Sequence, residues 1–447
     1  MADYDLVIIG GSLAGRYAAI LATEQGKKVA LVEPEETTLF NLLVPHALNQ
    51  LRQVKSQFFI PSISHQKSLS WAEVGQWIKN VIANIEEKNS LAILAALGVD
   101  VIVGSGEFSA QELLIKVNNR KLIARYYLVA TGAIPAVPKI SGLQAVNYFT
   151  PNNIGQQLDV ARLGKNWVII GSNPDSITWA QILTRLGFNI TLVVKSSQIL
   201  PSLDADVSYL VQAILEADGV RVLTEMTVSQ IKEINRKKWV QAGNEAIETD
   251  EILVCAGYQP NIKDLHLEAV KVKCHQRGIE VDSWLQTTNP QIYACGDVIG
   301  GYPYPNISNY EAKIAVNNAL LLPKLKVDYQ SIPWAIATTP QIAQVGFTEA
   351  QAKRFYSDVI VLQQNFKTVA AAQLSEETTG IYKLVVHRNR QILGATIVGT
   401  QSSELINLIA LAIAQKLKVE AISHLFPIYP SFSEIFARAI ANFKLKS

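Results

Sequence analysis

The stretch of sequence that decides the fold is LVIIGGSLAG, at residues 6–15. Its first four residues form a continuous apolar run, as expected for a parallel strand buried on both faces, and a glycine-rich turn follows them. A helical pattern and a second apolar run at 28–32 come next, and that run leads directly into Glu33. The order of strand, glycine turn, helix, strand and acidic residue predicts a βαβ unit that binds a dinucleotide.

The same pattern occurs a second time later in the chain. An apolar run at 167–170 leads into a turn at 171–176, and a helical segment and a further apolar run at 190–194 follow. After about residue 332, strand-like runs precede a long helical pattern at 403–416. We therefore predict an α/β chain with two nucleotide-type domains, followed by a domain of the α+β class.

Composition excludes several classes of function. The chain has 447 residues, with 40 basic and 38 acidic side chains and no long basic run, which argues against nucleic acid as a partner. Its three cysteines are too few for a disulfide framework, and its six histidines are scattered, so no metal site is expected. Because no apolar stretch is long enough to cross a membrane and no signal-like segment begins the chain, we predict a cytoplasmic protein without a membrane span.

Seven segments, in order along the chain, resemble the pyridine nucleotide-disulfide oxidoreductases, the family of dihydrolipoamide dehydrogenase, glutathione reductase and mercuric reductase. They are the first glycine turn with Glu33, then 130–132, Gly257 with Pro260 and Asn261, 286–290, 293–298, 339–346 and 429–434. The resemblance covers essentially the whole chain. It implies two Rossmann-like nucleotide-binding domains, a C-terminal α+β dimerisation domain, and a homodimer.

By the same resemblance, the FAD-binding domain comprises 1–149 and 289–331, the NAD(P)-binding-like domain 150–288, and the dimerisation domain 332–447.

The resemblance also implies which residues bind FAD. They are Gly10, Ser12, Gly15, Glu33, Thr131, Gly132, Gly296 and Asp297. The glycines let the backbone approach a pyrophosphate at a helix N-terminus, and Glu33 can accept hydrogen bonds from a ribose hydroxyl. Asp297 is expected to bind the ribityl chain of the flavin. Ser12 stands at the middle glycine position, which costs little if its backbone stays in an allowed region.

The family's electron relay from NAD(P)H through flavin to a cysteine pair is interrupted here. In the family the two cysteines precede a Val-Pro, here Val44-Pro45, and their positions hold Thr38 and Leu43. Neither residue can form a thiolate or a disulfide, so we expect no disulfide, dithiol or mercuric reductase activity. A lysine and a glutamate that the family places beside the flavin are also replaced, by His46-Ala47 and Thr178.

The second glycine turn departs from a dinucleotide site. Asn173 and Ser176 stand where glycines would be, and Asn173-Pro174-Asp175 has the pattern of an ordinary helix start. The added side chains and the Asp175 charge argue against tight NAD(P)H binding. Lys195 ends the second strand, where NADP-specific relatives carry a basic residue; it could contact a 2′-phosphate or be a solvated surface lysine. If a pyridine nucleotide binds, NADPH is therefore favoured over NADH.

Three residues are candidates for catalysis. Tyr429 replaces the histidine base of the family's tail motif, and Glu434 keeps its spacing. With a pKa near 10, a tyrosine can donate a proton but cannot act as a base at neutral pH, and its alternative role is a packed interface aromatic. His46 could donate a proton to reduced flavin or bind an acceptor, or be a structural histidine.

Two functions remain open from the sequence. The first is an FAD-dependent oxidoreductase that passes electrons from the flavin directly to an unidentified small acceptor, such as a quinone-like compound, without disulfide chemistry. The alternative is a non-catalytic or redox-sensing FAD-binding protein with a degenerate NAD(P) site.

Overall fold

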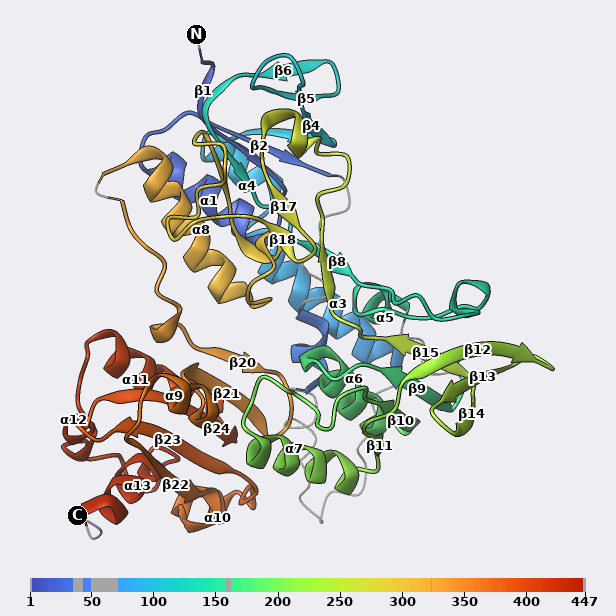
Figure 1. Cartoon of the computed structure of the whole chain (residues 1–447), viewed down its shortest axis with the longest axis vertical. Helices are drawn as coiled ribbons and strands as arrows, with labels where there is room; N and C mark the ends of the chain where they lie inside the picture. Colours follow the sequence, from blue (N-terminus) through green and yellow to red (C-terminus); the bar gives the residue numbers. More distant parts are fainter. Residues whose placement is uncertain (1, 35–42, 50–70, 158–161, 323, 445–447) are drawn as a thin grey trace. The chain divides into compact units, whose positions relative to one another are not determined.

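The computed structural model describes residues 2–34, 43–49, 71–157, 162–322 and 324–444. The chain divides into two compact units (Figure 1). The first unit consists of Met1–Val44, Ile63–Ala136 and Gly257–Val327. The second consists of Pro45–Ser62, Val137–Ala256 and Asp328–Ser447.

The first unit is built on a parallel five-stranded sheet whose central strand is the apolar run that begins the chain. The strand order is β19-β7-β1-β2-β3. The strands are β1 (Tyr4–Ile9), β2 (Val29–Glu33), β3 (Asp100–Val103), β7 (Ala124–Val129) and β19 (Ile292–Ala294). Residues 6–9 are fully buried, which explains why β1 is apolar at every one of these positions rather than at alternate ones.

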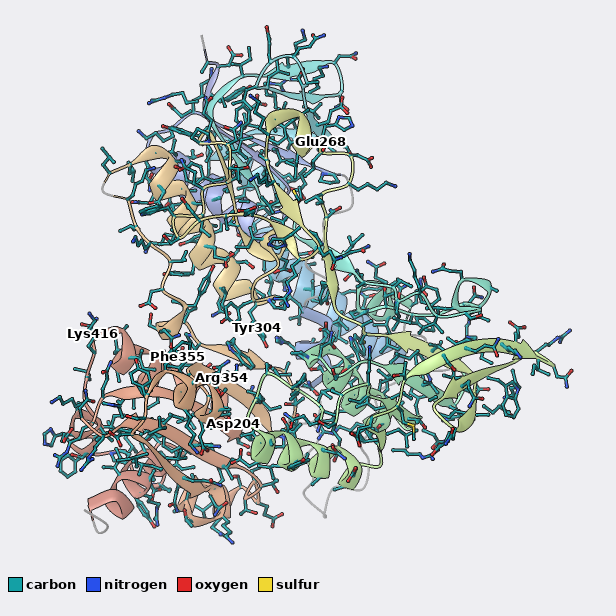
Figure 2. The ribbon with its side chains drawn as sticks, viewed as in Figure 1. Asp204, Glu268, Tyr304, Arg354, Phe355 and Lys416 are labelled. Carbon is teal, nitrogen blue, oxygen red and sulfur yellow. The ribbon has the colours of Figure 1, made fainter. Side chains whose placement is uncertain are left out.

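Both faces of this sheet are covered. Helices α1 (Leu13–Glu24) and α8 (Pro305–Leu320) pack on one face through small side chains, and α8 begins directly after Tyr304 (Figure 2). The other face packs against an antiparallel sheet and the segment 265–272, which contains Glu268 (Figure 2). That sheet consists of β4 (Gly106–Phe108), β5 (Ile115–Val117) and β6 (Arg120–Leu122).

The remaining elements of the first unit lie outside these two sheets and helices. They are a helix that begins at residue 43, α3 (Trp71–Glu87), α4 (Leu91–Ala96), β8 (Ala133–Pro135), β16 (Tyr258–Pro260), η2 (Leu267–Val270), β17 (Cys274–His275), β18 (Gly278–Ile279) and η3 (Gly296–Ile299). The helix at 43–49 begins in this unit and continues into the second.

The second unit contains another parallel sheet, with the order β11-β10-β9-β15. Its strands are β9 (Asn166–Ile170), β10 (Asn189–Val193), β11 (Arg221–Leu223) and β15 (Glu251–Val254), and helices α5 (Pro151–Gln157), α6 (Pro174–Arg185) and α7 (Ala205–Ala217) accompany it. One face packs against an antiparallel sheet of β12 (Val228–Ile234), β13 (Lys237–Ala242) and β14 (Glu245–Thr249). A short turn of 3-10 helix, η1 (Leu143–Ala145), contributes to the same core.

The C-terminal part of the second unit is an antiparallel sheet with helices. The strand order is β20-β21-β24-β23-β22, and α11, α12 and α13 share its core. The strands are β20 (Trp334–Ile336), β21 (Gln341–Gly346), β22 (Val359–Asn365), β23 (Ile381–His387) and β24 (Ile392–Gly399). The helices are η4 (Tyr329–Ser331), α9 (Glu349–Phe355), η5 (Phe366–Thr368), α10 (Ala370–Leu374), α11 (Ser402–Ala414), α12 (Val419–Ser423) and α13 (Glu434–Lys444).

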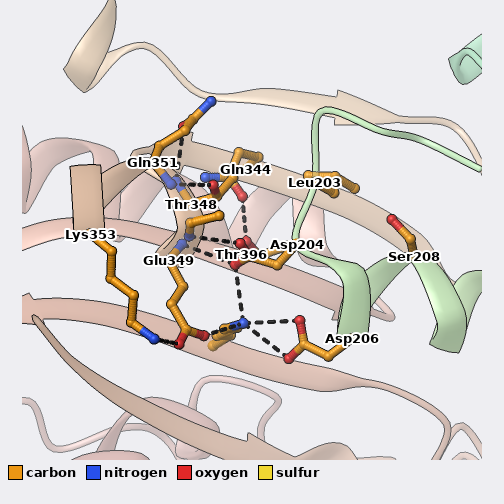
Figure 3. Close-up of polar contacts among 12 residues, drawn as sticks. Leu203, Asp204, Asp206, Ser208, Gln344, Thr348, Glu349, Gln351, Lys353 and Thr396 are labelled. Atoms are coloured by element: carbon orange, nitrogen blue, oxygen red, sulfur yellow. Dashed lines mark hydrogen bonds and ion pairs between the residues drawn. The ribbon is translucent and has the colours of Figure 1, made fainter. Parts of the chain in front are cut away.

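A buried lysine joins the two parts of the second unit. The Lys383 ammonium on β23 lies 3.1 Å from Asp204, 3.0 Å from Asp206 and 2.8 Å from Glu349 (Figure 3). Asp204 also accepts hydrogen bonds from the backbone N–H groups of Glu349 and Ala350. The group therefore connects the start of α7, the start of α9 and the C-terminal sheet, and we call Lys383, Asp204, Asp206 and Glu349 the Lys383 cluster.

The fold class predicted from the sequence is confirmed by these sheets: two parallel nucleotide-type sheets are followed by a C-terminal α+β region. The contacts group that C-terminal region with the second parallel sheet in one unit. The three domain boundaries drawn from the sequence stay a prediction.

Candidate functional site

The first glycine turn connects β1 to α1 in a shape that requires glycine. Gly10 has φ of +108°, and a Cβ atom there would collide with the carbonyl of Ala130 at the end of β7. Ser12 is the N-cap of α1, with φ of −60° and ψ of 168°, so its backbone lies in the allowed region that we expected. Its Oγ accepts a hydrogen bond from the Gly15 N–H at 3.3 Å and donates one to the Ala130 carbonyl at 2.8 Å.

The acidic residue at the end of β2 is held by an arginine that the sequence analysis did not identify. Glu33 is buried, and its Oε1 accepts a hydrogen bond from the guanidinium of Arg16 on α1. Burial raises the pKa of Glu33, and although the hydrogen bond and charge of Arg16 act in the opposite direction, the net shift is upward. The second oxygen, Oε2, is buried and has no hydrogen-bond partner among the described residues.

That orphaned oxygen is where a ligand hydroxyl fits. A buried acceptor without a donor is unfavourable, so its presence marks a place where a donor from outside the chain would be stabilised. A ribose hydroxyl is such a donor, and Glu33 ends the strand next to the glycine turn. The residues present therefore fit the adenosine half of FAD, with the pyrophosphate expected at the N-terminus of α1.

The remaining predicted FAD residues follow β7 and β19. The hydroxyl of Thr131 donates to the Asn261 carbonyl at 2.7 Å, and Gly132 has φ of +70°. The Gly296 N–H donates to the buried Glu311 carboxylate at 2.6 Å, and Asp297 is half-buried beside it.

The structure brings all eight predicted FAD residues to one edge of the first sheet. Glu33 ends β2 and the other seven follow β1, β7 and β19, and because these strands are parallel, their carboxyl ends meet at that edge. A ligand that spans the edge would meet the glycine turn and Glu33 at one end and Asp297 at the other.

The second glycine turn has the local structure predicted for it. Asn173 is the N-cap of α6, Pro174 is the first helical residue and Asp175 lies in the first turn. The Asn173 side chain accepts a hydrogen bond from the Ser176 N–H at 3.0 Å, and the Ser176 hydroxyl donates to the Asn173 carbonyl at 2.7 Å. One of the helix N–H groups that would otherwise bind a phosphate is therefore bonded to Asn173. Lys195, just after β10, is exposed.

The three catalytic candidates belong to the second unit, whereas the predicted FAD residues belong to the first. Tyr429 is exposed over 75% of its surface. Glu434 is buried at the start of α13, where it accepts a hydrogen bond from the Ser431 N–H and pairs with Arg438, both at 3.2 Å. His46 exposes more than a third of its surface, and partial desolvation by the surrounding protein lowers its pKa.

The two positions expected to carry cysteines are only partly described. Thr38 lies outside the described residues, and Leu43 begins the helix at 43–49. All three cysteines of the sequence are described, and none forms a disulfide. Cys255 and Cys295 are buried, which raises their pKa well above the usual value, whereas Cys274 is exposed on β17.

Neither a metal-binding cluster nor a membrane-spanning helix occurs among the described residues. No group of three or more His, Cys, Asp or Glu side chains placed to hold a metal ion occurs in the part of the chain that the structure describes. Of the helices in the described ranges, none is both long and apolar enough to cross a membrane.

Arg16 is the functional candidate that sequence reasoning missed. It lies in a helix whose other inward residues are small, and it is buried. The signal available in the sequence was a single charged residue within an alanine-rich helix directly after the glycine turn, but its partner could be known only from the fold.

Comparison with known proteins places these features in a family. The model of the pyridine nucleotide-disulphide oxidoreductases matches residues 4–319, and the model of their dimerisation domain matches residues 332–440. A mercuric reductase from Staphylococcus aureus is 31% identical over 455 residues, covering 99% of this chain and 82% of the relative. A dihydrolipoyl dehydrogenase from Bacillus subtilis (strain 168) is 27% identical, covering 98% of each chain.

Solved structures show the same fold. The flavoprotein disulfide reductase RclA from Escherichia coli, in its Cu(II) complex, superposes with a TM-score of 0.86 at 24% identity, covering 97% of this chain and 98% of that one. LpdA from Mycobacterium tuberculosis gives a TM-score of 0.87 at 24% identity, covering 98% and 99%. At these identities the likeness concerns the fold alone.

Proposed function

The chain belongs to the pyridine nucleotide-disulphide oxidoreductase family, whose members depend on FAD and use NAD(P)H, and from that membership we propose a flavin-dependent oxidoreductase that works without a redox-active disulfide. The proposal rests on the contrast between a retained FAD site and missing cysteines. The eight residues suited to FAD are retained at one sheet edge, whereas the sequence has no cysteine among its first 254 residues.

The proposed roles in the FAD site follow from the contacts. The glycine turn and the N-terminus of α1 hold the pyrophosphate, Glu33 accepts from the ribose, and Asp297 binds the ribityl chain. When bound, FAD supplies transfer of electrons between a nicotinamide and an acceptor. The chain's own residues bind and orient it, and the acceptor would replace the absent disulfide.

The three cysteines do not offer a substitute for that disulfide. Burial raises the pKa of Cys255 and Cys295, which keeps both as thiols at neutral pH, and a thiol is a poor nucleophile compared with a thiolate. Burial and the charge of Glu268 also raise the pKa of the exposed Cys274. We therefore propose a small, flat or apolar acceptor, such as a quinone, that receives electrons from the flavin directly.

For the electron donor we propose a weakened pyridine nucleotide site that favours NADPH over NADH. The Asn173 side chain accepts a hydrogen bond from an N–H group at the start of α6, and Asp175 adds a negative charge in the first turn. Both therefore oppose the binding of a phosphate group there. Lys195 is exposed just after β10, and we propose that its charge attracts a 2′-phosphate.

We further propose a cytoplasmic homodimer in which Tyr429 and Glu434 contribute to the partner's site. In support, the chain just before α13 exposes Phe426 over 94%, Ile428 over 81% and Tyr429 over 75% of their surfaces, and a run of exposed apolar residues is typical of an interface. In that site Tyr429 would donate a hydrogen bond or proton. His46, with its lowered pKa, would be neutral at pH 7.

A second candidate function is a non-catalytic or redox-sensing flavoprotein. The capped N-terminus of α6 favours this alternative, because the cap weakens the proposed NAD(P)H site. The experiment that separates the two is an anaerobic titration of the flavin-loaded protein with NADPH and then NADH, followed by addition of quinones. Bleaching of the flavin absorbance and its recovery on adding a quinone support the enzyme. Failure of every acceptor to reoxidise flavin already reduced by dithionite supports the alternative.

A further inference from the structure

Arg16 is a buried charge in a place where the family motif does not need one. The rest of the inward face of α1 is formed by small residues, at Ala14, Gly15, Ala18, Ala19 and Ala22. The Arg16 side chain is only 7% exposed, and its guanidinium donates to Oε1 of Glu33 and, at 3.1 Å, to the backbone carbonyl of Asn89. Among the described residues, the arginine thus contacts the residue at the end of β2 and the segment between α3 and α4.

Stability alone does not account for this ion pair. Removing two charges from water is costly, and a buried pair offsets that cost only when the remaining polar atoms are also bonded. Here Glu33 is 2% exposed, and its Oε2 has no partner among the described residues. The net upward shift of the Glu33 pKa agrees with incomplete compensation of its charge.

The position of the unpaired oxygen is fixed from two sides. Arg16 binds Oε1, and the Glu33 carboxylate lies so close to Gly11 that a Cβ atom there would overlap Oε2. Glycine at position 11 therefore makes room for the carboxylate, which rests against the backbone of the glycine turn.

We propose that Arg16 is a positioning residue for the cofactor: by binding Oε1 of Glu33, it directs Oε2 to the hydroxyl groups of the adenosine ribose of FAD. The inference rests on the proposed FAD site. It adds that Arg16, which contacts Glu33 and not the ribose itself, sets the affinity for the ribose. Because the effect acts through one oxygen, Arg16 governs recognition of the ribose hydroxyls specifically and not binding of the pyrophosphate or the flavin ring.

The test compares FAD with an FAD analogue whose adenosine ribose lacks both hydroxyl groups. The full chain is stripped of flavin and titrated with each compound, and dissociation constants are measured from the change in flavin fluorescence. The variants are Arg16→Met, which removes the charge at similar length, Arg16→Lys, which keeps it, and Glu33→Gln. Arg125→Met is the matched control, because Arg125 is an exposed arginine on the same sheet.

We expect Arg16→Met to weaken FAD binding about tenfold to a hundredfold, the range for a lost hydrogen bond to a charged group, and to change binding of the analogue less than about threefold. Arg16→Lys should recover most of the loss, and Arg125→Met should change neither constant. Adding Arg16→Met to Glu33→Gln should have little further effect, since both act on the same contact.

An equal loss for FAD and for the analogue would overturn the proposal, because a merely structural arginine would affect both ligands alike. Unchanged FAD affinity in Arg16→Met would overturn it as well. If Arg16→Met does not fold, Arg16→Gln decides by the same comparison, since a glutamine removes the charge but keeps a polar side chain at this buried position and should weaken FAD but not the analogue. A wild-type chain that binds the two compounds equally would also overturn the proposal, because Glu33 would then make no contact with the ribose hydroxyls. The FAD site itself would be refuted separately, by a wild-type chain that binds neither compound.

Discussion

Replacing Lys383 by methionine tests whether the second unit depends on the Lys383 cluster. The substitution keeps the length and apolar stem of the side chain and removes only the ammonium. It leaves three carboxylates without their shared partner: Asp204, Asp206 and Glu349, all within 3.1 Å of the lysine nitrogen in the wild type (Figure 3).

The expected loss is about 3 kcal/mol. Breaking a buried ion pair by removing one partner costs roughly 3–5 kcal/mol. The side chains of Lys383 and Asp204 are 3% and 6% exposed, so this range applies to their ion pair. The side chains of Glu349 and Asp206 are 27% and 47% exposed, so water compensates part of their charge. The lower end of the range therefore applies.

The assay is native-state hydrogen exchange of the full chain, which reports local free energies of opening and does not require two-state unfolding of a large protein. We expect the opening free energy of β23 and of the first turn of α9 to fall by about 3 kcal/mol in Lys383→Met. Lys353→Met is the control, because Lys353 is exposed and, among the described residues, forms its ion pair with Glu349 on the same helix, a contact worth about 0.5 kcal/mol.

The dependence on pH follows from two opposite shifts. Burial lowers the pKa of Lys383, but hydrogen bonds to Glu349, Asp206 and Asp204 raise it by more. The contribution of Lys383 to the free energy of unfolding is therefore complete below the unfolded pKa of about 10.4, and it is lost as the pH rises through the folded value. Hydrogen bonds to Lys353 and Lys383 lower the pKa of Glu349, so its contribution is present above about pH 4.3 and is lost on acidification.

The difference between wild type and Lys383→Met should therefore be constant between about pH 5 and pH 9 and shrink below about pH 4. A loss below about 0.5 kcal/mol at pH 7, or one equal to that of Lys353→Met, would refute the assignment of the cluster as a main contact of the second unit.

Three further predictions concern the donor site and the dimer. Asp175→Asn should tighten NADPH binding about threefold to fivefold by removing a like charge from the first turn of α6, measured by flavin bleaching or calorimetry; weaker binding would contradict the proposed repulsion. Lys195→Glu should lower the preference for NADPH over NADH by at least about fivefold, and an unchanged ratio would identify Lys195 as a surface lysine. Phe426→Ser should raise the dimer dissociation constant at least about tenfold in sedimentation velocity, because this side chain is 94% exposed in the single chain; an unchanged constant would place the interface elsewhere.

Local structure was predictable from the sequence where neighbouring residues determine it. The buried strand at 6–9 and the helix start at Asn173 were both expected and both found, since an apolar run and an N-cap followed by proline act within one or two turns of chain. The backbone of Ser12 likewise lies in the allowed region that its role requires.

Long-range pairs were not predictable. Arg16 is part of a helical pattern in the sequence, and only the fold places it beside Glu33. The Lys383 cluster combines residues from α7, α9 and β23, with no spacing that relates them. Glu434 was a catalytic candidate from its spacing to Tyr429, and the contacts of its carboxylate with the Ser431 N–H, just before α13, and with Arg438 could be known only from the fold. Its catalytic role stays a prediction.

The measurement that tests the central claim most directly is the number of electrons the protein accepts. The flavin-loaded full chain is titrated anaerobically with dithionite, and the flavin absorbance is followed to complete reduction. A flavin alone takes up two electrons, and a flavin coupled to a disulfide takes up four, because a disulfide is itself a two-electron couple. We expect two electrons per FAD; four electrons per FAD would show a second redox couple and contradict a flavin that works without a disulfide.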